Sequence, residues 1–438
     1  MAELNAKEQK EKSVPHHHQY SMETMRQFIT LVLSVATSLR GAGSVLKFNA
    51  EENDQEIESP SWSTGRLWLL RLGYYKLTRP KEKGNDWVWI VDHTVQWGTE
   101  KCLVVVGFRM GSWLEGSVGH EELEPILLEP VKESNGEVVY KQLEKAALKT
   151  GIPREIVGDE GSDLKAGIRR FCAEHKKTDF VYDIKHKVAV VLKRELSGEE
   201  GWKRFTEQTG KVRQEVQQTS LAALASPNQR SKARYMNVDV LVKWGQKLLT
   251  FMEEDTGSGR ELFSWEKVEK HFGWIREYRE ALSAWGEMLG VVETVEHYVR
   301  KQGLCRQTAE KLAEQLSIPL QTARGCRIRD ELLEHVWEES AKAKRGERLY
   351  GSSEVLESVF GKFKRLEQNQ AKSGFTGLLL GIAAMVSQTT EQVIQKCMET
   401  VSTQKVLEWT RENLGITLNA KRRLAFNSGT KVGSNVLS

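Results

Sequence analysis

The sequence predicts a mixed α/β core that is interrupted by a large all-helical block. Two observations lead to this fold class. Short continuous apolar runs, such as Trp87–Val91 and Cys102–Phe108, have the length and composition of buried strands. Between about 197 and 345, by contrast, the chain is rich in Gln, Glu, Lys and Arg and shows no strand alternation. Hydrophobic residues make up 39% of the 438 residues, which is enough for a sizeable core.

Five strands and two helices are expected in the first part of the core. Their order is three strands, a helix, a strand, a helix and a strand, which is a mixed α/β layout. The segments are Trp87–Val91, Cys102–Phe108, Ile126–Leu128, the helix Gly136–Lys149, Glu155–Gly158, the helix Leu164–His175 and Phe180–Tyr182. A helical pattern follows the helical block and continues to about Leu414.

The segment before the core has the pattern of three helices behind a polar tail. From Ser21 apolar residues recur at helical spacing, and Ser38 can cap a second helix. Pro60 and Ser61 open a third helix, which should stop near Gly73.

Composition narrows the class of protein without deciding it. Basic residues number 64 and acidic residues 60, so only the distribution of charge can indicate a nucleic-acid partner. The five cysteines are scattered and form no CxxC pair, which favours a reducing compartment over a disulfide framework. No apolar run has the length of a membrane span, and the first residues lack the apolar stretch of a signal peptide. We therefore expect a cytoplasmic protein, associated with the nucleoid if it binds DNA, and no membrane partner.

Two aspartates directly follow predicted strands. Asp92 ends the first strand and Asp159 the fourth. In the RNase H topology these strands are parallel neighbours, so their carboxyl ends would bring both carboxylates together, at the edge where open α/β sheets place their sites. Like charges so close require a cation, and an all-oxygen donor set suits Mg²⁺ or Mn²⁺. Asp163 is the alternative second ligand, although its position also suits the capping of the next helix.

With these residues in place, the sequence resembles the DDE transposases of bacterial-type insertion sequences that carry a large insertion before the final Glu. Many of them have a Tyr, an Arg three residues later, the catalytic Glu four residues after that, and a Lys seven further on. Tyr350, Glu357 and Lys364 match this spacing, while Ser353 stands where the Arg is expected. Arg348 is a possible replacement for that Arg.

Two further points bear on this resemblance. Glu354 is the alternative third acid, although a Glu in a first helical turn often only balances the helix dipole. Asp183 and His186 form an Asp-x-x-His motif similar to one in Mutator-type and hAT-type transposases. The resemblance implies that both residues support the active site without ligating metal.

The resemblance implies a domain organisation for the whole chain. It comprises a flexible tail at 1–20, a helix-turn-helix at 21–82, an RNase H-like core in two parts at 85–196 and 346–438, and an all-helical insertion at 197–345. In such families the insertion grips the transposon end. Trp274 and Trp285 are candidates for base stacking there, although tryptophans in helical proteins mostly belong to the core. Phosphate contacts are expected from Arg230, Lys232, Arg234 and Arg348.

The third N-terminal helix has the composition of a DNA-reading helix. Ser61, Ser63 and Thr64 are short polar residues at its start, and Arg66 follows them. One feature departs from the usual motif: the acidic connector from Asn49 to Ser59 is longer than a turn of about 3–4 residues.

The function expected from these features is cut-and-paste DNA transposition. Asp92, Asp159 and Glu357 would hold two Mg²⁺ or Mn²⁺ ions for cleavage and strand transfer at terminal inverted repeats. The partners would be double-stranded DNA, at both transposon end and target, and at least one further copy of the chain. Two alternatives remain open at this point: an RNase H-like nuclease without strand transfer, and a transposase-derived DNA-binding regulator without catalysis.

Overall fold

The protein is described here by a computed structural model. It divides into two compact units, one of residues 1–181 and 353–438 (unit 1) and one of residues 182–352 (unit 2). The residues whose structure is described are 14–15, 18–52, 59–113, 116, 118–229, 238–254, 260–369, 375–416 and 418–426. Among them, no helix has both the length and the apolar character of a membrane span.

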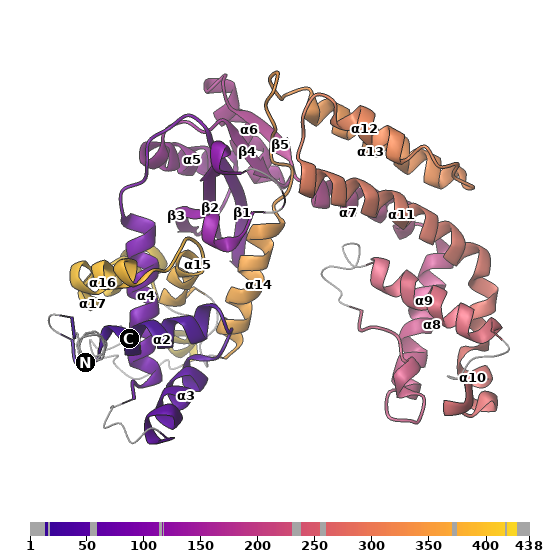
Figure 1. The fold of residues 1–438 in the computed structure, drawn as a ribbon, viewed down its shortest axis with the longest axis horizontal. Coiled ribbons are helices and arrows are strands. Elements are labelled where there is room, and N and C mark those ends of the chain that lie inside the picture. The colour runs from indigo at the N-terminus through magenta and orange to yellow at the C-terminus, as the bar shows by residue number, and fades with distance from the viewer. Residues whose placement is uncertain are drawn as a thin grey trace, which may run out of the picture. The chain divides into compact units, whose positions relative to one another are not determined.

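A five-stranded mixed sheet lies at the centre of unit 1 (Figure 1). Its strands stand in the order β3-β2-β1-β4-β5. β1 pairs antiparallel with β2 and parallel with β4, and β2 pairs antiparallel with β3. The parallel pairing of the first and fourth strands confirms the neighbours predicted from the sequence. The strands are β1 (Trp87–Trp97), β2 (Glu100–Arg109), β3 (Glu124–Val131), β4 (Glu155–Gly158) and β5 (Asp179–Tyr182).

Three strands are longer than the apolar runs that predicted them. β1 and β2 continue through polar residues to a turn at Gly98, whose φ of 62° favours glycine. β3 includes Pro125 and Pro130, which cannot donate to a sheet ladder. Both prolines are accommodated because β3 is the edge strand and pairs on one side only.

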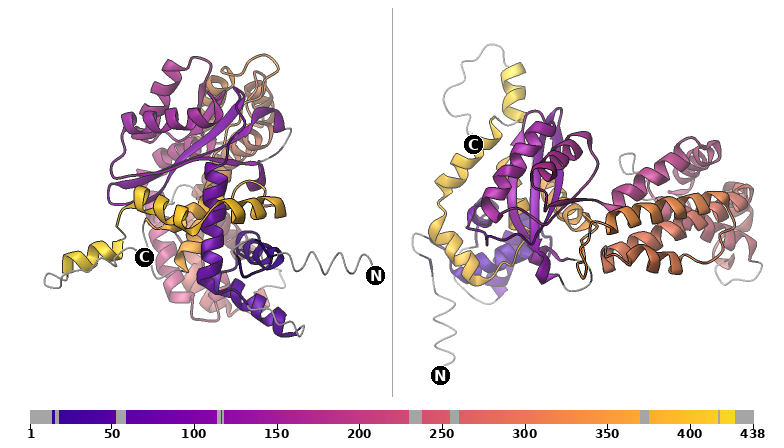
Figure 2. Two further views of the ribbon diagram at one scale, coloured as in Figure 1. Left: turned by 90° about the vertical axis from the view of Figure 1, so that its left-hand side faces the viewer. Right: turned by 90° about the horizontal axis from the view of Figure 1, so that it is seen from above.

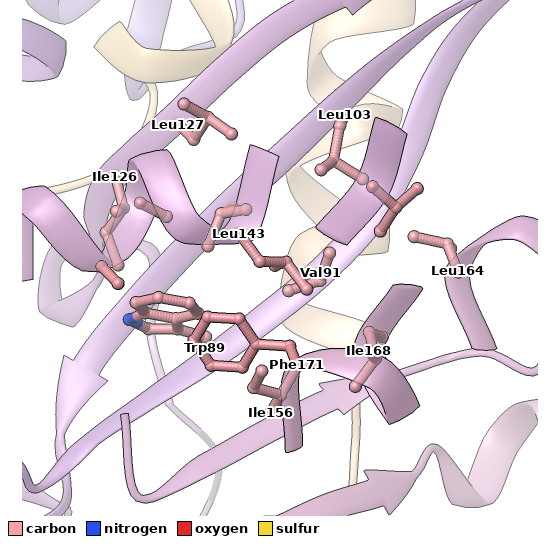
Figure 3. Close-up of a cluster of buried hydrophobic side chains, with 14 of the residues drawn as sticks. Trp89, Val91, Leu103, Ile126, Leu127, Leu143, Ile156, Leu164, Ile168 and Phe171 are labelled. Carbon is pink, nitrogen blue, oxygen red and sulfur yellow. The ribbon is translucent and has the colours of Figure 1, made fainter. Parts of the chain in front are cut away.

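One face of the sheet is covered by α5 (Gly136–Thr150) and α6 (Ser162–Glu174). Alternate residues of β1 point into the apolar layer between them: Trp87, Trp89 and Val91 are buried there (Figure 3). Phe171 of α6 lies with its ring centre 5.8 Å from that of Trp89. Because side chains of a strand alternate between faces, this packing fixes which face every other β1 residue takes.

Helices from both ends of the chain pack together in the rest of unit 1 (Figure 2). α14 packs against β1, and α4 packs against β3 and against the C-terminal helices α15, α16 and α17. α2 and α3 pack against α4. The bounds are α2 (Met22–Leu33), α3 (Leu39–Glu52), α4 (Trp62–Thr78), α14 (Glu354–Gln368), α15 (Leu380–Ala384), α16 (Glu391–Thr400), α17 (Thr403–Leu414) and α18 (Leu418–Phe426).

The prediction that the third N-terminal helix stops near Gly73 is wrong, because α4 continues to Thr78. Gly73 is buried, and a Cβ there would lie only 1.9 Å from the carbonyl oxygen of Leu380. The glycine therefore permits a close approach of α15 and does not end the helix. As a result α2–α4 belong to the same compact unit as the sheet, whereas the sequence assigned them to a domain of their own.

Lys76 fastens α4 to the segment that follows α15. Its side chain is fully buried, and its ammonium donates to the carbonyl oxygens of Ala384 (3.1 Å), Val386 (2.8 Å) and Ser387 (2.7 Å) and to the hydroxyl of Thr389 (2.7 Å). These bonds satisfy carbonyls at the end of a short helix, which would otherwise be buried at a cost. Burial lowers the pKa of Lys76 to about 7.

Unit 2 is helical over its described residues, apart from the end of β5 and an isolated bridge between Leu304 and Leu349. It starts at Tyr182, so that α7, which the sequence assigned to the core, falls in the helical unit. Its helices are α7 (Ile184–Ser197), α8 (Glu200–Val216), α9 (Val238–Glu253), α10 (Trp265–Phe272), α11 (Arg279–Gln302), α12 (Thr308–Gln315) and α13 (Ala323–Ser340).

The lowered pKa of Lys76 predicts a specific dependence of stability on pH. Between about pH 7 and pH 10 the unfolded chain binds a proton that the folded chain has released. The free energy of unfolding of the wild type should therefore rise with pH relative to that of Lys76→Met, by at most about 1.4 kcal/mol per pH unit. Urea titrations at several pH values would measure this difference. Parallel pH profiles of stability for the wild type and Lys76→Met would contradict this prediction. Lys47→Met, at an exposed site on α3, is the control.

Candidate functional site

Asp92 and Asp159 take equivalent positions on two neighbouring strands. In the parallel pairing of β1 with β4, Val91 stands opposite Gly158, and each aspartate is the next residue along the chain. Asp159 directly follows the end of β4, whereas Asp92 lies within β1, so the prediction that Asp92 ends the first strand is wrong. Adjacent strands run about 4.8 Å apart, so the two backbones remain close at this point. Both side chains are half-buried. The pairing thus places Asp92 and Asp159 at neighbouring backbone positions, and the meeting of their carboxylates stays a prediction.

Each aspartate accepts a hydrogen bond from a nearby backbone N–H group. Oδ1 of Asp92 accepts from the backbone N–H of His93 at 2.6 Å, and Oδ1 of Asp159 accepts from that of Gly161 at 3.0 Å. Because Val91 points into the layer under α5 and α6, strand alternation directs Asp92 to the opposite face. That is the face on which α14 packs against β1.

Asp163, the alternative second ligand, accepts hydrogen bonds from other residues. Its carboxylate accepts from Lys101 Nζ at 2.7 Å and from the backbone N–H of Leu164 at 3.1 Å. His93 Nδ1 lies 3.9 Å from it, and Ser134 Oγ lies 3.3 Å from His93 Nε2. One carboxylate therefore links α6 to β1, to β2 and to the loop before α5. Gly161, not Asp163, is the N-cap of α6, so the capping role expected for Asp163 is wrong.

Electrostatics agree with a structural role for Asp163. Burial alone would raise its pKa, but hydrogen bonds from Lys101 and Ser134 and the nearby charges lower the pKa to about 2. Burial lowers the pKa of His93, with an opposing influence from Asp163. The sequence analysis missed His93, Lys101 and Ser134. Only strand alternation signalled His93, since it places the residue after Asp92 on the α6 face.

Glu357 and Glu354 both lie in the first turn of α14 and are both half-buried. The degree of burial therefore does not indicate whether Glu354 or Glu357 is the better candidate for the third acid. Phe360 is buried and Lys364 is exposed. Residues four apart are neighbours on one face of a helix, so this pair lies where the packed side of α14 meets its exposed side. Glu357 stands at the boundary between the packed and the exposed sides.

The residues before α14 do not extend that helix. Tyr350 and Ser353 are buried and precede the first helical residue. The carbonyl of Ser353 accepts from the backbone N–H of Leu356 and of Glu357, at 2.9 and 3.2 Å. Ser353 thus begins the helix instead of presenting a phosphate-binding side chain. Arg348, the possible replacement for the missing Arg, is half-buried.

The Asp-x-x-His motif forms a helix cap in unit 2. Asp183 is fully buried and is the N-cap of α7, where it accepts from the backbone N–H of Lys185 and of His186. Its carboxylate also lies 2.6 Å from His186 Nδ1. The spacing of the motif therefore has a local explanation, because a residue at the third helical position reaches back to the cap.

The candidate DNA-reading residues surround the start of α4. Ser61 is the N-cap and accepts from the backbone N–H of Thr64 at 3.1 Å. Ser61 and Ser63 are exposed, and their hydroxyls lie 2.8 Å apart. Arg66 is half-buried, and burial lowers its pKa. The serines are therefore the more accessible part of this set.

The two tryptophans proposed for base stacking belong to the interior of unit 2. Trp285 is fully buried, and its ring packs edge-on against that of Trp202 with centres 4.9 Å apart. Trp274 is half-buried, packs against Phe205, and donates to the carbonyl of His271 at 2.8 Å. Stacking by Trp285 is thus excluded in this structure. Three of the expected phosphate contacts lie outside the described residues: Arg230, Lys232 and Arg234.

Comparisons with known proteins give distant structural likenesses. No family model and no curated protein matches the chain. Among solved structures, one similar chain belongs to the Drosophila P element transposase strand transfer complex, with a TM-score of 0.38 and 10% identity. The match covers 87% of this chain and 93% of that one. At this distance the function has to be argued from the chain's own residues.

The adjacency of Asp92 and Asp159 predicts a cation site that can be tested without an activity assay. Asp92→Asn or Asp159→Asn should weaken Mn²⁺ binding about tenfold or more, because even residues that only orient ligands contribute about 10–100-fold. In metal-free buffer the same substitutions should raise the melting temperature, since they remove repulsion between like charges.

Isothermal titration with Mn²⁺ and thermal unfolding in chelator would measure the two effects. Asp163→Asn is the matched control, a carboxylate four residues along that is held by Lys101. Mn²⁺ binding that depends on Asp163 and not on Asp159 would reverse the assignment.

Proposed function

We propose that this chain is a cut-and-paste DNA transposase with an RNase H-like core. The observation that carries the proposal is the equivalent position of two aspartates on neighbouring parallel strands: Asp92 follows Val91 in β1, and Asp159 follows Gly158, the last residue of β4. The strand order β3-β2-β1-β4-β5, with β1, β2 and β3 antiparallel in turn and β4 parallel to β1, supports the RNase H-like topology. The match of Tyr350, Glu357 and Lys364 to the spacing of DDE transposases supports the particular activity.

The residues present suit a pair of Mg²⁺ or Mn²⁺ ions. Asp92 and Asp159 offer only oxygen ligands, which these hard cations prefer, and their closeness favours a site that is neutralised by positive charge. Asp92 would be shared between the ions, with Asp159 and Glu357 holding one each. Bound there, the ions would supply activation of the attacking hydroxyl and stabilisation of the leaving 3′-oxygen.

The protein's own residues would fix the geometry of the reaction. The backbone N–H groups of His93 and Gly161 each donate to Oδ1 of an aspartate and so restrict the orientation of its carboxylate. Asp163, pinned by Lys101, anchors the start of α6 and with it the turn that carries Asp159. No serine or tyrosine nucleophile is required, since water and then a 3′-hydroxyl attack phosphorus directly.

Recognition of the transposon end is assigned to the start of α4. Ser61 and Ser63 are exposed at a helix N-terminus, which suits contacts to a DNA backbone and to base edges. Since α4 is packed into unit 1, this reader would be rigidly attached to the catalytic core. Pairing of two ends requires at least a dimer on DNA.

Catalysis can be tested by changing each acid to its amide. Asp92→Asn, Asp159→Asn and Glu357→Gln should each lower the rate of cleavage and strand transfer by about three orders of magnitude or more, because each loses charge that holds an ion at the scissile phosphate. DNA binding should persist, since affinity comes mainly from basic contacts. The assay follows a labelled transposon-end duplex with Mg²⁺ or Mn²⁺.

Asp163→Asn and Glu354→Gln are the matched controls and should retain measurable activity. Full activity of any of the three amide variants removes that residue from the site. Cleavage by the wild type without joining of the 3′ end would identify a nuclease, and an inert wild type that still binds its ends would identify a regulator.

A further inference from the structure

Ser387 adopts a backbone conformation that is uncommon outside glycine. Its φ is 65°, in the left-handed region, and the residue is buried. Ala36 has a similar φ of 58°, but it lies in an exposed turn between α2 and α3. A strained residue persists where its surroundings hold it, and such residues cluster at functional sites. The strain indicates that contacts with neighbouring residues, and not local preference, determine the conformation of Ser387.

Contacts from three segments hold Ser387. Its carbonyl accepts from Lys76 Nζ at 2.7 Å, and its hydroxyl lies 2.7 Å from both Arg79 Nη2 and Glu124 Oε1. Its backbone N–H donates to the carbonyl of His120 at 2.8 Å. Lys76 and Arg79 belong to the end of α4, Glu124 begins β3, and His120 lies in the short helical turn before β3. The backbone of His120 is therefore tied to α4 and β3 through a single residue.

The ring of His120 extends these contacts to α14. Its Nδ1 lies 3.0 Å from Nζ of Lys362. An ammonium can only donate, so Nδ1 of His120 is the acceptor in this contact. Burial, and next the charge of Lys362, lower the pKa of His120, so the ring is neutral near pH 7 and keeps a lone pair for the bond. Lys362 stands five residues beyond Glu357 on the same helix, about 7.5 Å along its axis.

The apolar packing of α14 does not by itself fix where Glu357 lies. The buried residues of this helix are apolar, and the helix packs against β1 and α15. Such packing is non-directional, so it holds α14 in place but permits small slides and rotations. A hydrogen bond weakens steeply when its geometry changes, so the contact between His120 and Lys362 restricts both movements. At a catalytic site a displacement of about 1 Å can cost about 100-fold in rate.

We propose that His120 is a positioning residue for Glu357. Its contact with Lys362 sets the position of α14 along β1, and Ser387 holds His120 in place. His120 itself touches neither the cations nor the DNA. The inference rests on the proposed function, because it takes Glu357 as the third metal ligand. It adds that the placement of this acid depends on the turn before β3 and, through Ser387, on α4, the helix assigned to recognition of the transposon end.

Substitutions at His120 test the proposal through the Mn²⁺ affinity of the full chain, measured by isothermal titration without DNA. His120→Leu should weaken the binding of one of the two ions about tenfold, because Glu357 is displaced from it. His120→Asn should restore most of the affinity, since its amide oxygen can accept from Lys362. Lys362→Met should match His120→Leu, and the double variant should bind no more weakly than either single variant, because both changes remove the same contact.

His175→Leu is the matched control. His175 is another half-buried histidine, with Nε2 2.7 Å from Glu144, and it follows α6 on the other face of the sheet from α14. The control should lower the melting temperature about as much as His120→Leu does, yet leave Mn²⁺ affinity unchanged. Equal losses of affinity in the two variants, or wild-type affinity in His120→Leu, overturn the proposal.

The Glu357→Gln background shows whether His120 acts through Glu357. There His120→Leu should have no further effect on Mn²⁺ affinity, and a further loss overturns the proposal. In the cleavage assay, His120→Leu should lower the single-turnover rate at saturating protein about tenfold or more, with the half-saturating concentration nearly unchanged and the rate largely restored in His120→Asn.

The two readouts distinguish the positioning from the chemistry. A wild type that never cleaves DNA, but whose Mn²⁺ binding depends on both Glu357 and His120, refutes the proposed catalysis and leaves the positioning role standing. Mn²⁺ binding and cleavage that depend on Glu357 but not on His120 refute the positioning role and leave the catalysis standing.

Discussion

The parallel pairing of β1 with β4 holds Asp92 and Asp159 at neighbouring positions of the sheet, and the candidate site depends on it. Val91 stands opposite Gly158, so Asp92 and Asp159 follow at equivalent positions. The apolar layer under α5 and α6 fixes the register, because a slip by one residue would turn Trp89 and Val91 out of that layer. The same layer directs Asp92 to the face that α14 covers. Hydrophobic packing therefore determines where the charged side chains of the candidate site lie.

The proposed third acid, Glu357, lies on a helix far along the chain, and its position depends on contacts between the two ends of unit 1. α14 packs on β1 and against α15, and α15 packs on α4. The close approach at Gly73 and the buried ammonium of Lys76 join α4 to α15 and to the segment after it. The N-terminal helices thus support the core as well as carrying Ser61 and Ser63, the proposed DNA contacts.

Local pattern predicted β1, β2 and β4 because buried strands are continuous apolar runs. It singled out Asp92 and Asp159 as candidates because both follow such runs. The pattern did not predict features that depend on contacts between residues far apart in the sequence. Gly73 was taken for a helix stop, whereas the carbonyl of Leu380 explains it. Lys101 and Ser134 reach hydrogen-bonding distance of Asp163 only when the chain folds. No spacing in the sequence indicates these contacts. The choice of Glu357 over Glu354 still rests on the motif, since both are half-buried.

The central claim is that Asp92, Asp159 and Glu357 together hold two divalent cations. Anomalous diffraction from crystals of the full chain grown with Mn²⁺ and a transposon-end duplex tests it most directly. The account predicts two Mn²⁺ peaks about 3.5–4 Å apart, bridged by Asp92 and flanked by Asp159 and Glu357. Peaks ligated by Asp163 or Glu354 instead, or no Mn²⁺ at the ends of β1 and β4, would contradict it.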